Sequence, residues 1–135
     1  MTFKQAVVAR LASDPDIARY TGGSIRFSRR LTNTTAISLQ IIADQRPQTF
    51  KGFDLRQTTI QVDFWSDDET MAEQLRDRGI AALIPAAEVD GIKFQRAMIA
   101  GSRSGGEIEQ SGQSQRHRGE LFRESVDIIF THNAN

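Results

Sequence analysis

The apolar positions at the start of the chain recur at helical spacing. Residues 3–11 carry an apolar stripe, and Thr2 with Gln5 three residues later is the pattern of a capping box, so a helix is predicted to begin here. Asp14 followed by Pro15 predicts a second helix start, because a proline at the first helical position loses no hydrogen bond. The Gly-Gly pair that follows predicts that this second helix is short.

Farther along the chain, apolar and polar side chains alternate, which is the period of a strand with one buried face. The alternation appears in residues 24–27, 35–43, 58–65, 88–101 and 120–132. In the third of these segments, Ile60, Val62 and Phe64 are predicted to face the core. In the fourth, Phe94 and Met98 are predicted to share a face.

The stretch QVDFWSDDET, residues 61–70, contains four acidic residues. A strand end followed by a helix start explains them. Ser66 and Glu69 have the spacing of a capping box, and acids in a first helical turn complement the helix dipole. The alternative is a divalent-metal site formed by Asp63, Asp67, Asp68 and Glu69. Neither of the two histidines lies at ligand spacing from another candidate, so the helix cap is the favoured interpretation.

Two polar segments interrupt these patterns, residues 44–54 and residues 101–119. The second contains five Gly and four Ser with hardly an apolar residue, so it is predicted to be a long loop or an extended arm. Strands joined by short or polar loops favour antiparallel pairing. Residues 1–135 are therefore predicted to form one α+β domain, a mostly antiparallel β-sheet packed on one face by two α-helices.

The composition agrees with one domain and narrows the function. A chain of 135 residues can bury a single core without disulfides, and this chain contains no Cys. Lys+Arg and Asp+Glu each number 17, so no global charge attracts the chain to nucleic acid or to an acidic membrane surface. No apolar run approaches the roughly 20 residues of a membrane span, and the N-terminus lacks the apolar segment of a signal peptide. We therefore expect no membrane partner.

No catalytic motif is recognisable in the sequence. It contains no G-x-S-x-G elbow, no Walker loop and no G-x-G-x-x-G, so neither an enzyme nor a cofactor is predicted. The candidate interface or DNA-facing residues are Arg29, Arg30, Trp65, Arg103, Arg116, His117 and Arg118. The cations can meet phosphates or a partner's acids, or they are simply solvated. Trp65 points away from the core face, so it is predicted either to lie under a helix or to anchor a subunit contact.

Three segments together carry a resemblance that spans nearly the whole chain. They are AVVARLASDPDIARYTGGSIRF near the N-terminus, RQTTIQVDFWSDDETMAEQLRDRGIAALI in the middle and GELFRESVDIIFTHN toward the C-terminus. In this order they resemble the tail-completion proteins, or tail terminators, of long-tailed bacteriophages, prophages and gene transfer agents. The strongest part is the strand that ends in an aromatic pair, followed by a capped helix rich in Ala and Leu.

The resemblance implies a structural role without catalysis. Such proteins form a homo-oligomeric ring, typically a hexamer, on the last ring of the major tail tube protein. The ring stops tube growth, presents a surface to the head-completion (stopper) protein and lets DNA pass through its lumen without sequence recognition. The resemblance also implies a place in the virion at the head–tail junction, after assembly in the bacterial cytoplasm.

Three alternatives stay open at this point. The first is another component of the head–tail connector. The second is a small metal-dependent hydrolase that uses the four acids of residues 61–70. The third is a nucleic-acid-binding module that uses Arg103, Arg116 and Arg118, with an affinity that falls steeply with salt.

Overall fold

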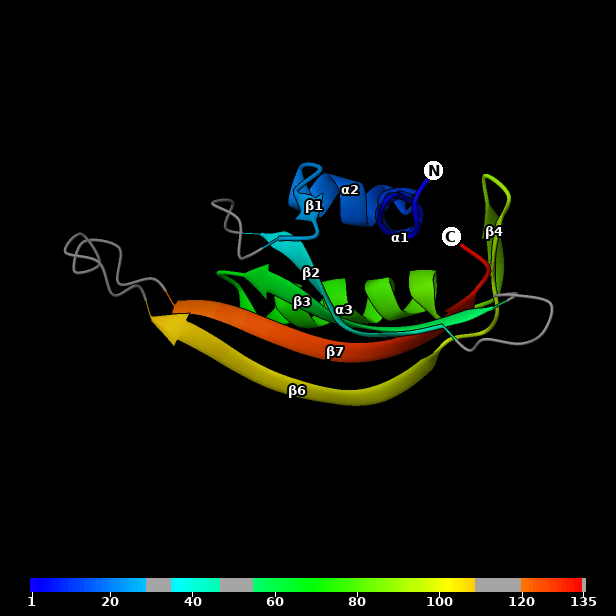
Figure 1. Cartoon of the computed structure of the whole chain (residues 1–135). Coiled ribbons are helices and arrows are strands. Elements are labelled where there is room, and N and C mark those ends of the chain that lie inside the picture. The colour runs from blue at the N-terminus through cyan, green and yellow to red at the C-terminus, as the bar shows by residue number, and fades with distance from the viewer. Residues whose placement is uncertain (29–34, 47–54, 109–119, 135) are drawn as a thin grey trace.

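The computed structural model describes residues 1–28, 35–46, 55–108 and 120–134. These residues form three helices, α1 (Phe3–Ala12), α2 (Pro15–Thr21) and α3 (Glu69–Leu83). They also form the strands β1 (Ile25–Arg26), β2 (Ala36–Gln45), β3 (Arg56–Ser66), β4 (Ala87–Val89), β5 (Ile92–Phe94), β6 (Met98–Ile108) and β7 (Glu120–His132). Figure 1 shows a long curled sheet with the helices on one side of it. No helix in this described part of the chain is long and apolar enough to span a membrane.

The long strands run antiparallel, but their order in the sheet differs from their order in the chain. The sheet order is β1-β2-β3-β7-β5-β4, and β6 also pairs with β7. The pairs β2–β3, β3–β7 and β6–β7 are antiparallel, whereas the short β1 runs parallel to β2. The α+β class is therefore confirmed. The finer prediction of two helices on an antiparallel sheet is not, because the described residues form three helices and a mixed sheet.

Local capping explains where the first two helices begin and end. The Thr2 hydroxyl accepts the Gln5 backbone N–H at 3.2 Å, and the Thr2 backbone N–H donates to the Gln5 side chain at 2.9 Å, so the predicted capping box is confirmed. Asp14 caps α2, with Pro15 at its first position. Gly22 ends α2 in the left-handed conformation, with a φ of 61°.

The helix after the acidic stretch begins later than predicted. Asp68, and not Ser66, is the N-cap of α3, and its side chain accepts the Thr70 backbone N–H at 3.1 Å. Ser66 is still part of β3, where it pairs with Phe122 of β7, and its hydroxyl accepts the Asp68 backbone N–H. The strand end followed by a capped helix is therefore confirmed, but the residues of the cap are corrected.

α3 packs on the sheet face that the alternation predicts to be the core. Ile60, Val62 and Phe64 of β3 are completely buried. Gly79 lets α3 approach this strand closely, because a Cβ at that position would collide with the ring of Phe64. A side chain at this position therefore requires the ring or the helix to move.

Part of the segment predicted to be a long loop is a strand. Residues 101–108 belong to β6, which pairs with β7 along its length. The Gly and Ser residues of β6 give no apolar alternation, but β7 supplies the ladder hydrogen bonds that hold them extended. Residues 44 and 45 of the other predicted loop likewise belong to β2. Residue 46 is described and belongs to no strand, and residues 47–54 and 109–119 of the two predicted loops lie outside the described residues.

The predicted shared face of Phe94 and Met98 is wrong. β5 ends at Phe94 and β6 begins at Met98, so one alternating pattern does not run through both strands. Phe94 and the intervening Ala97 are buried, whereas Met98 is 67% exposed.

Candidate assembly surfaces

One face of the long sheet carries no helix in the described part of the chain (Figure 1). Polar residues of β3 and β7 occupy this uncovered face. Asp63 accepts hydrogen bonds from the Gln61 amide at 3.0 and 3.1 Å and from the Ser125 hydroxyl. This carboxylate is therefore held by neighbours on its own sheet, in an arrangement that any solvated polar face can form.

Arg103 is the one candidate cation that falls within the described residues. It lies on β6, and its Nη1 donates to Asp127 Oδ2 on β7 at 3.1 Å. The hydrogen bond from Arg103 to Asp127 and their charge attraction raise the pKa of Arg103. The arginine side chain is half exposed, so Asp127 neutralises it without removing it from solvent. The other candidate cations, Arg29, Arg30, Arg116, His117 and Arg118, lie outside the described residues.

Trp65 is part of the packing of the sheet itself. It is 4% exposed, and its indole Nε1 donates to the Ser38 hydroxyl on β2 at 3.0 Å. The Arg123 guanidinium on β7 lies 5.5 Å from the centre of its ring. These contacts come from the two flanking strands, so a role of Trp65 between subunits stays a prediction.

The acids after the tryptophan strand do not converge on a point. Asp67, Asp68 and Glu69 are exposed at the start of α3, whereas Asp63 lies on the uncovered sheet face. Within the described ranges, no group of three or more His, Asp or Glu side chains could hold a metal ion. The geometry therefore gives the hydrolase alternative no metal-binding cluster among these residues.

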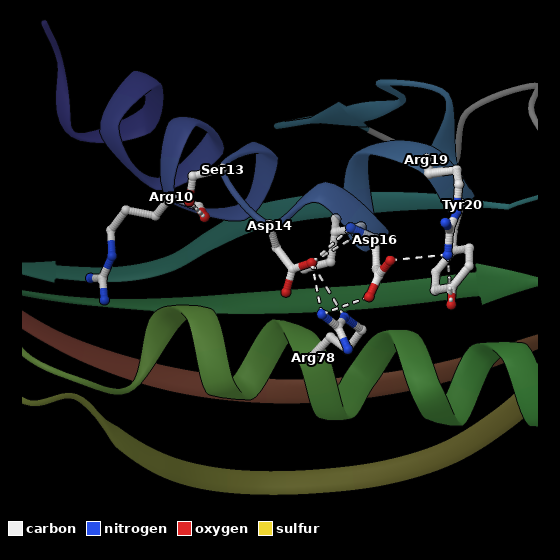
Figure 2. Close-up of polar contacts among 8 residues, drawn as sticks. Arg10, Ser13, Asp14, Asp16, Arg19, Tyr20 and Arg78 are labelled. Carbon is white, nitrogen blue, oxygen red and sulfur yellow. Dashed lines mark hydrogen bonds and ion pairs between the residues drawn. The ribbon is translucent and has the colours of Figure 1, made fainter.

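A second polar cluster joins the helices to one another, as Figure 2 shows. Arg78 of α3 donates to Asp14 Oδ1 at 3.1 Å and lies 2.8 Å from Asp16 Oδ2. Arg19 also pairs with Asp16, at 2.9 Å. Desolvation raises the pKa of Asp14, but hydrogen bonds from Arg78 and from backbone N–H groups of α2 outweigh it, so the net shift is downward. Two acids balance two arginines here, and we interpret the cluster as a clamp that fixes α2 on α3.

The lateral edges of the sheet carry a different kind of surface. Three of the large apolar side chains that are exposed in the described part of the chain lie there: Ile42 on β2, and Met98 and Ile99 on β6. Sequence reasoning missed them, because exposure at an edge depends on which strands pair. One signal was available: the second isoleucine of the IIA stretch breaks the alternation, and a β-bulge between Ile41 and Ala43 accommodates it.

Comparisons with known proteins agree with this architecture. The family model described as "Tail completion protein gp17" matches residues 5–128. A solved chain in a structure described as "Virion of native gene transfer agent (GTA) particle" superposes with a TM-score of 0.68 at 14% sequence identity. That match covers 98% of this chain and 94% of the other. At this identity the likeness shows a shared fold. A search of curated protein sequences finds no match.

Proposed function

The chain belongs to the tail completion protein gp17 family, and from this premise we propose that it closes the head-proximal end of a tail tube as a ring. Membership makes the chain a structural protein of phage-type tails. In the proposal, the ring is a hexamer of single-domain subunits that stops tube growth and joins the tail to the head-completion (stopper) protein. Shape and mutual contact, and not catalysis, then perform the function.

The observation that best supports the proposed ring is that one subunit has two unlike lateral surfaces. A closed ring requires a head-to-tail contact, in which two different surfaces of neighbouring copies meet. β6 and β2 lie toward opposite sides of the sheet, and each exposes apolar side chains. A net charge of zero adds no repulsion between copies. This shape supports a cyclic assembly better than a two-fold dimer.

We propose that the uncovered sheet face lines the lumen of the ring. The carboxylate of Asp63 repels phosphates, and Asp127 neutralises Arg103 beside it. A wall of this kind lets DNA pass without holding it, because tight DNA binding depends on unpaired cations that meet phosphates. In this proposal the DNA is cargo that moves through the ring and is not recognised by sequence.

The remaining predicted contacts belong to the two axial neighbours. We propose that Arg29, Arg30, Arg116, His117 and Arg118 meet acidic surfaces of the tube protein or the stopper, or the DNA itself. The proposed place in the virion is the head–tail junction, reached after assembly in the bacterial cytoplasm.

Electron microscopy with preformed tubes tests the proposal. Purified tubes of the major tail protein from the same genome are mixed with the folded chain, and tube ends are averaged. We expect a six-fold ring on one end of the tubes. Glu73→Lys, an exposed change on α3, should leave capping intact and serves as the matched control. Bare ends at saturating protein would reject the proposed function.

A further inference from the structure

Two stretches of strand have an edge without a described partner. β6 pairs with β7 on one side and with no described strand on the other. β1 covers only Ile37 and Ser38 of β2, so residues 39–45 also have no described strand on the side away from β3. Unpaired backbone groups along an edge strand are a template for pairing with another chain.

The two edges present their apolar residues at the same height of the sheet. Strand pairing connects Ile41 to Ile60, Ile60 to Ile128, and Ile128 to Ile99. Ile99, which is 47% exposed, ends this row at one edge. Ile42, which is 50% exposed, follows Ile41 at the other. When two copies stand side by side in the same orientation, Ile99 of one copy therefore lies opposite Ile41 of the next, beside Ile42.

The strand directions fit the same contact. β2 is antiparallel to β3, β3 to β7, and β7 to β6, so β6 runs opposite to β2. In a ring every subunit has the same orientation relative to the axis. β6 of one copy and β2 of the next therefore run antiparallel, and the alternation of the long strands continues across the boundary.

A groove beside the open edge of β2 provides room for a partner's side chain. It has a volume of about 400 Å³, and Phe27, Leu39 and Ile41 are among the residues that line it. Ile99 pairs with the buried Ile128, so its side chain lies on the helix-covered face of the sheet. Leu39 and Ile41 lie on that face too, because they pair with the buried Val62 and Ile60. Ile99 of a paired neighbour therefore reaches the groove.

On the basis of the ring proposed above, we propose that β6 of one copy pairs antiparallel with residues 39–45 of β2 in the next copy. Ile99 then packs into the groove beside Leu39 and Ile41, and Met98 covers the region of Ile42. The occupant of the groove is thus a second copy of this chain. Repeated around the axis, the contact joins the sheets of all copies into one continuous wall.

Cysteine crosslinking tests the contact without background, because the chain contains no Cys. Ile41→Cys and Ile99→Cys are introduced together and treated with a short thiol crosslinker of about 5 Å, the separation of directly opposed side chains on adjacent strands. We expect a ladder of covalent oligomers that ends at the ring size. Each single variant, and the matched pair Ile41→Cys with Glu73→Cys, should give no ladder.

Each outcome distinguishes the contact from the proposed function. Dimers from either single variant would show a two-fold contact and overturn the inference. Rings on tube ends without crosslinks in the double variant would also overturn it, while the proposed function stands. A ladder with bare tube ends would support the contact and reject the terminator role.

A second variant tests the contact in the absence of a crosslinker. Ile99→Lys places a charge on an exposed edge, so the fold should survive, with an unchanged circular dichroism spectrum. We expect the fraction of protein in rings to fall at least tenfold. A folded Ile99→Lys protein that forms rings as the parent does would overturn the proposed contact.

Discussion

At the scale of single residues, Gly79 is a position where close packing leaves no room for a side chain. Its Cα approaches the ring of Phe64 so closely that a Cβ would collide with the ring. Gly79→Ala should therefore lower the free energy of unfolding by about 1–3 kcal/mol, although Ala favours a helix more than Gly does. Urea unfolding measures the change.

Gly101→Ala is the matched control for this substitution. The nearest heavy atom to a Cβ at Gly101 is Asp127 Oδ2 at 3.9 Å, which is ordinary contact. We expect a change within about 0.5 kcal/mol. Equal effects of the two substitutions would show that the close contact with Phe64 is not what makes position 79 sensitive.

His132 lies at the end of a directed chain of hydrogen bonds. Its Nδ1 accepts the Ala134 backbone N–H at 3.1 Å, so Nε2 carries the proton and donates to the Thr58 hydroxyl at 2.8 Å. That hydroxyl donates to Asp44 Oδ1 at 3.1 Å. Burial, together with the charge of Arg56, lowers the pKa of His132 to about 4. A protonated ring would turn an N–H toward the Ala134 N–H, so the neutral form suits this site.

The pKa of His132 predicts how stability changes with pH. The unfolded pKa is 6.5 and the folded pKa is about 4, so between these values the unfolded chain binds a proton that the folded chain does not. The stability contributed by this group is therefore complete above about pH 6.5 and is lost as the pH falls toward 4, by up to about 3 kcal/mol.

Urea unfolding of a histidine variant isolates this contribution. His132→Asn should be less stable at neutral pH and should lose most of the slope between pH 6.5 and 4. A slope unchanged in His132→Asn would contradict the assignment to His132.

At the scale of elements, Arg10 of α1 satisfies the end of α3. Its Nη2 donates to the carbonyl oxygens of Ala82 at 3.0 Å and Pro85 at 2.7 Å. Its guanidinium lies 4.9 Å from the ring centre of Phe94. Figure 2 shows the Arg10 side chain pointing toward the C-terminal end of α3, away from the Asp14 cluster. Burial lowers the pKa of Arg10, and the negative end of the helix dipole compensates for part of the desolvation.

Arg10→Met keeps most of the side-chain volume and removes both hydrogen bonds. We expect it to lower the free energy of unfolding by about 1.5–3 kcal/mol, the usual value of hydrogen bonds from a charged group. Thermal and urea unfolding measure this loss. Arg19→Met, which breaks an exposed pair with Asp16, should cost less than about 1 kcal/mol. Equal losses of unfolding free energy in the two variants would contradict a stabilising role of the hydrogen bonds from Arg10 to the two carbonyl groups.

The elements that sequence predicts best are those with local signals. The capping box at Thr2 and the Asp14-Pro15 start determine two helix beginnings through neighbouring residues, and both are confirmed. Residues 101–108 of β6 have no local signal, because their extended form depends on β7, which follows across residues 109–119. The N-cap of α3 is Asp68 and not the predicted Ser66, again because of a distant strand: pairing with β7 extends β3 through Ser66.

At the scale of the whole molecule, the surfaces that we assign to assembly arise from topology. Ile41 and Ile99 are distant in the sequence, and only the strand order places them at opposite edges of one row. Of the cations chosen from sequence, Arg103 is paired on the sheet, and the others lie outside the described residues. The family was recognisable from sequence because the order of its helices and strands follows the chain. The contact between copies was not recognisable, because it depends on which distant strands pair.

The arrest of tube growth tests the central claim most directly. Tubes of the major tail protein are grown with increasing amounts of this chain, and their lengths are measured by electron microscopy. We expect the mean tube length to fall as the amount of this chain rises, even when the rings are fewer than the layers of tube subunits. With folded Ile99→Lys, we expect tubes as long as those grown without added protein. Tubes that elongate equally with and without saturating folded protein would contradict the central claim.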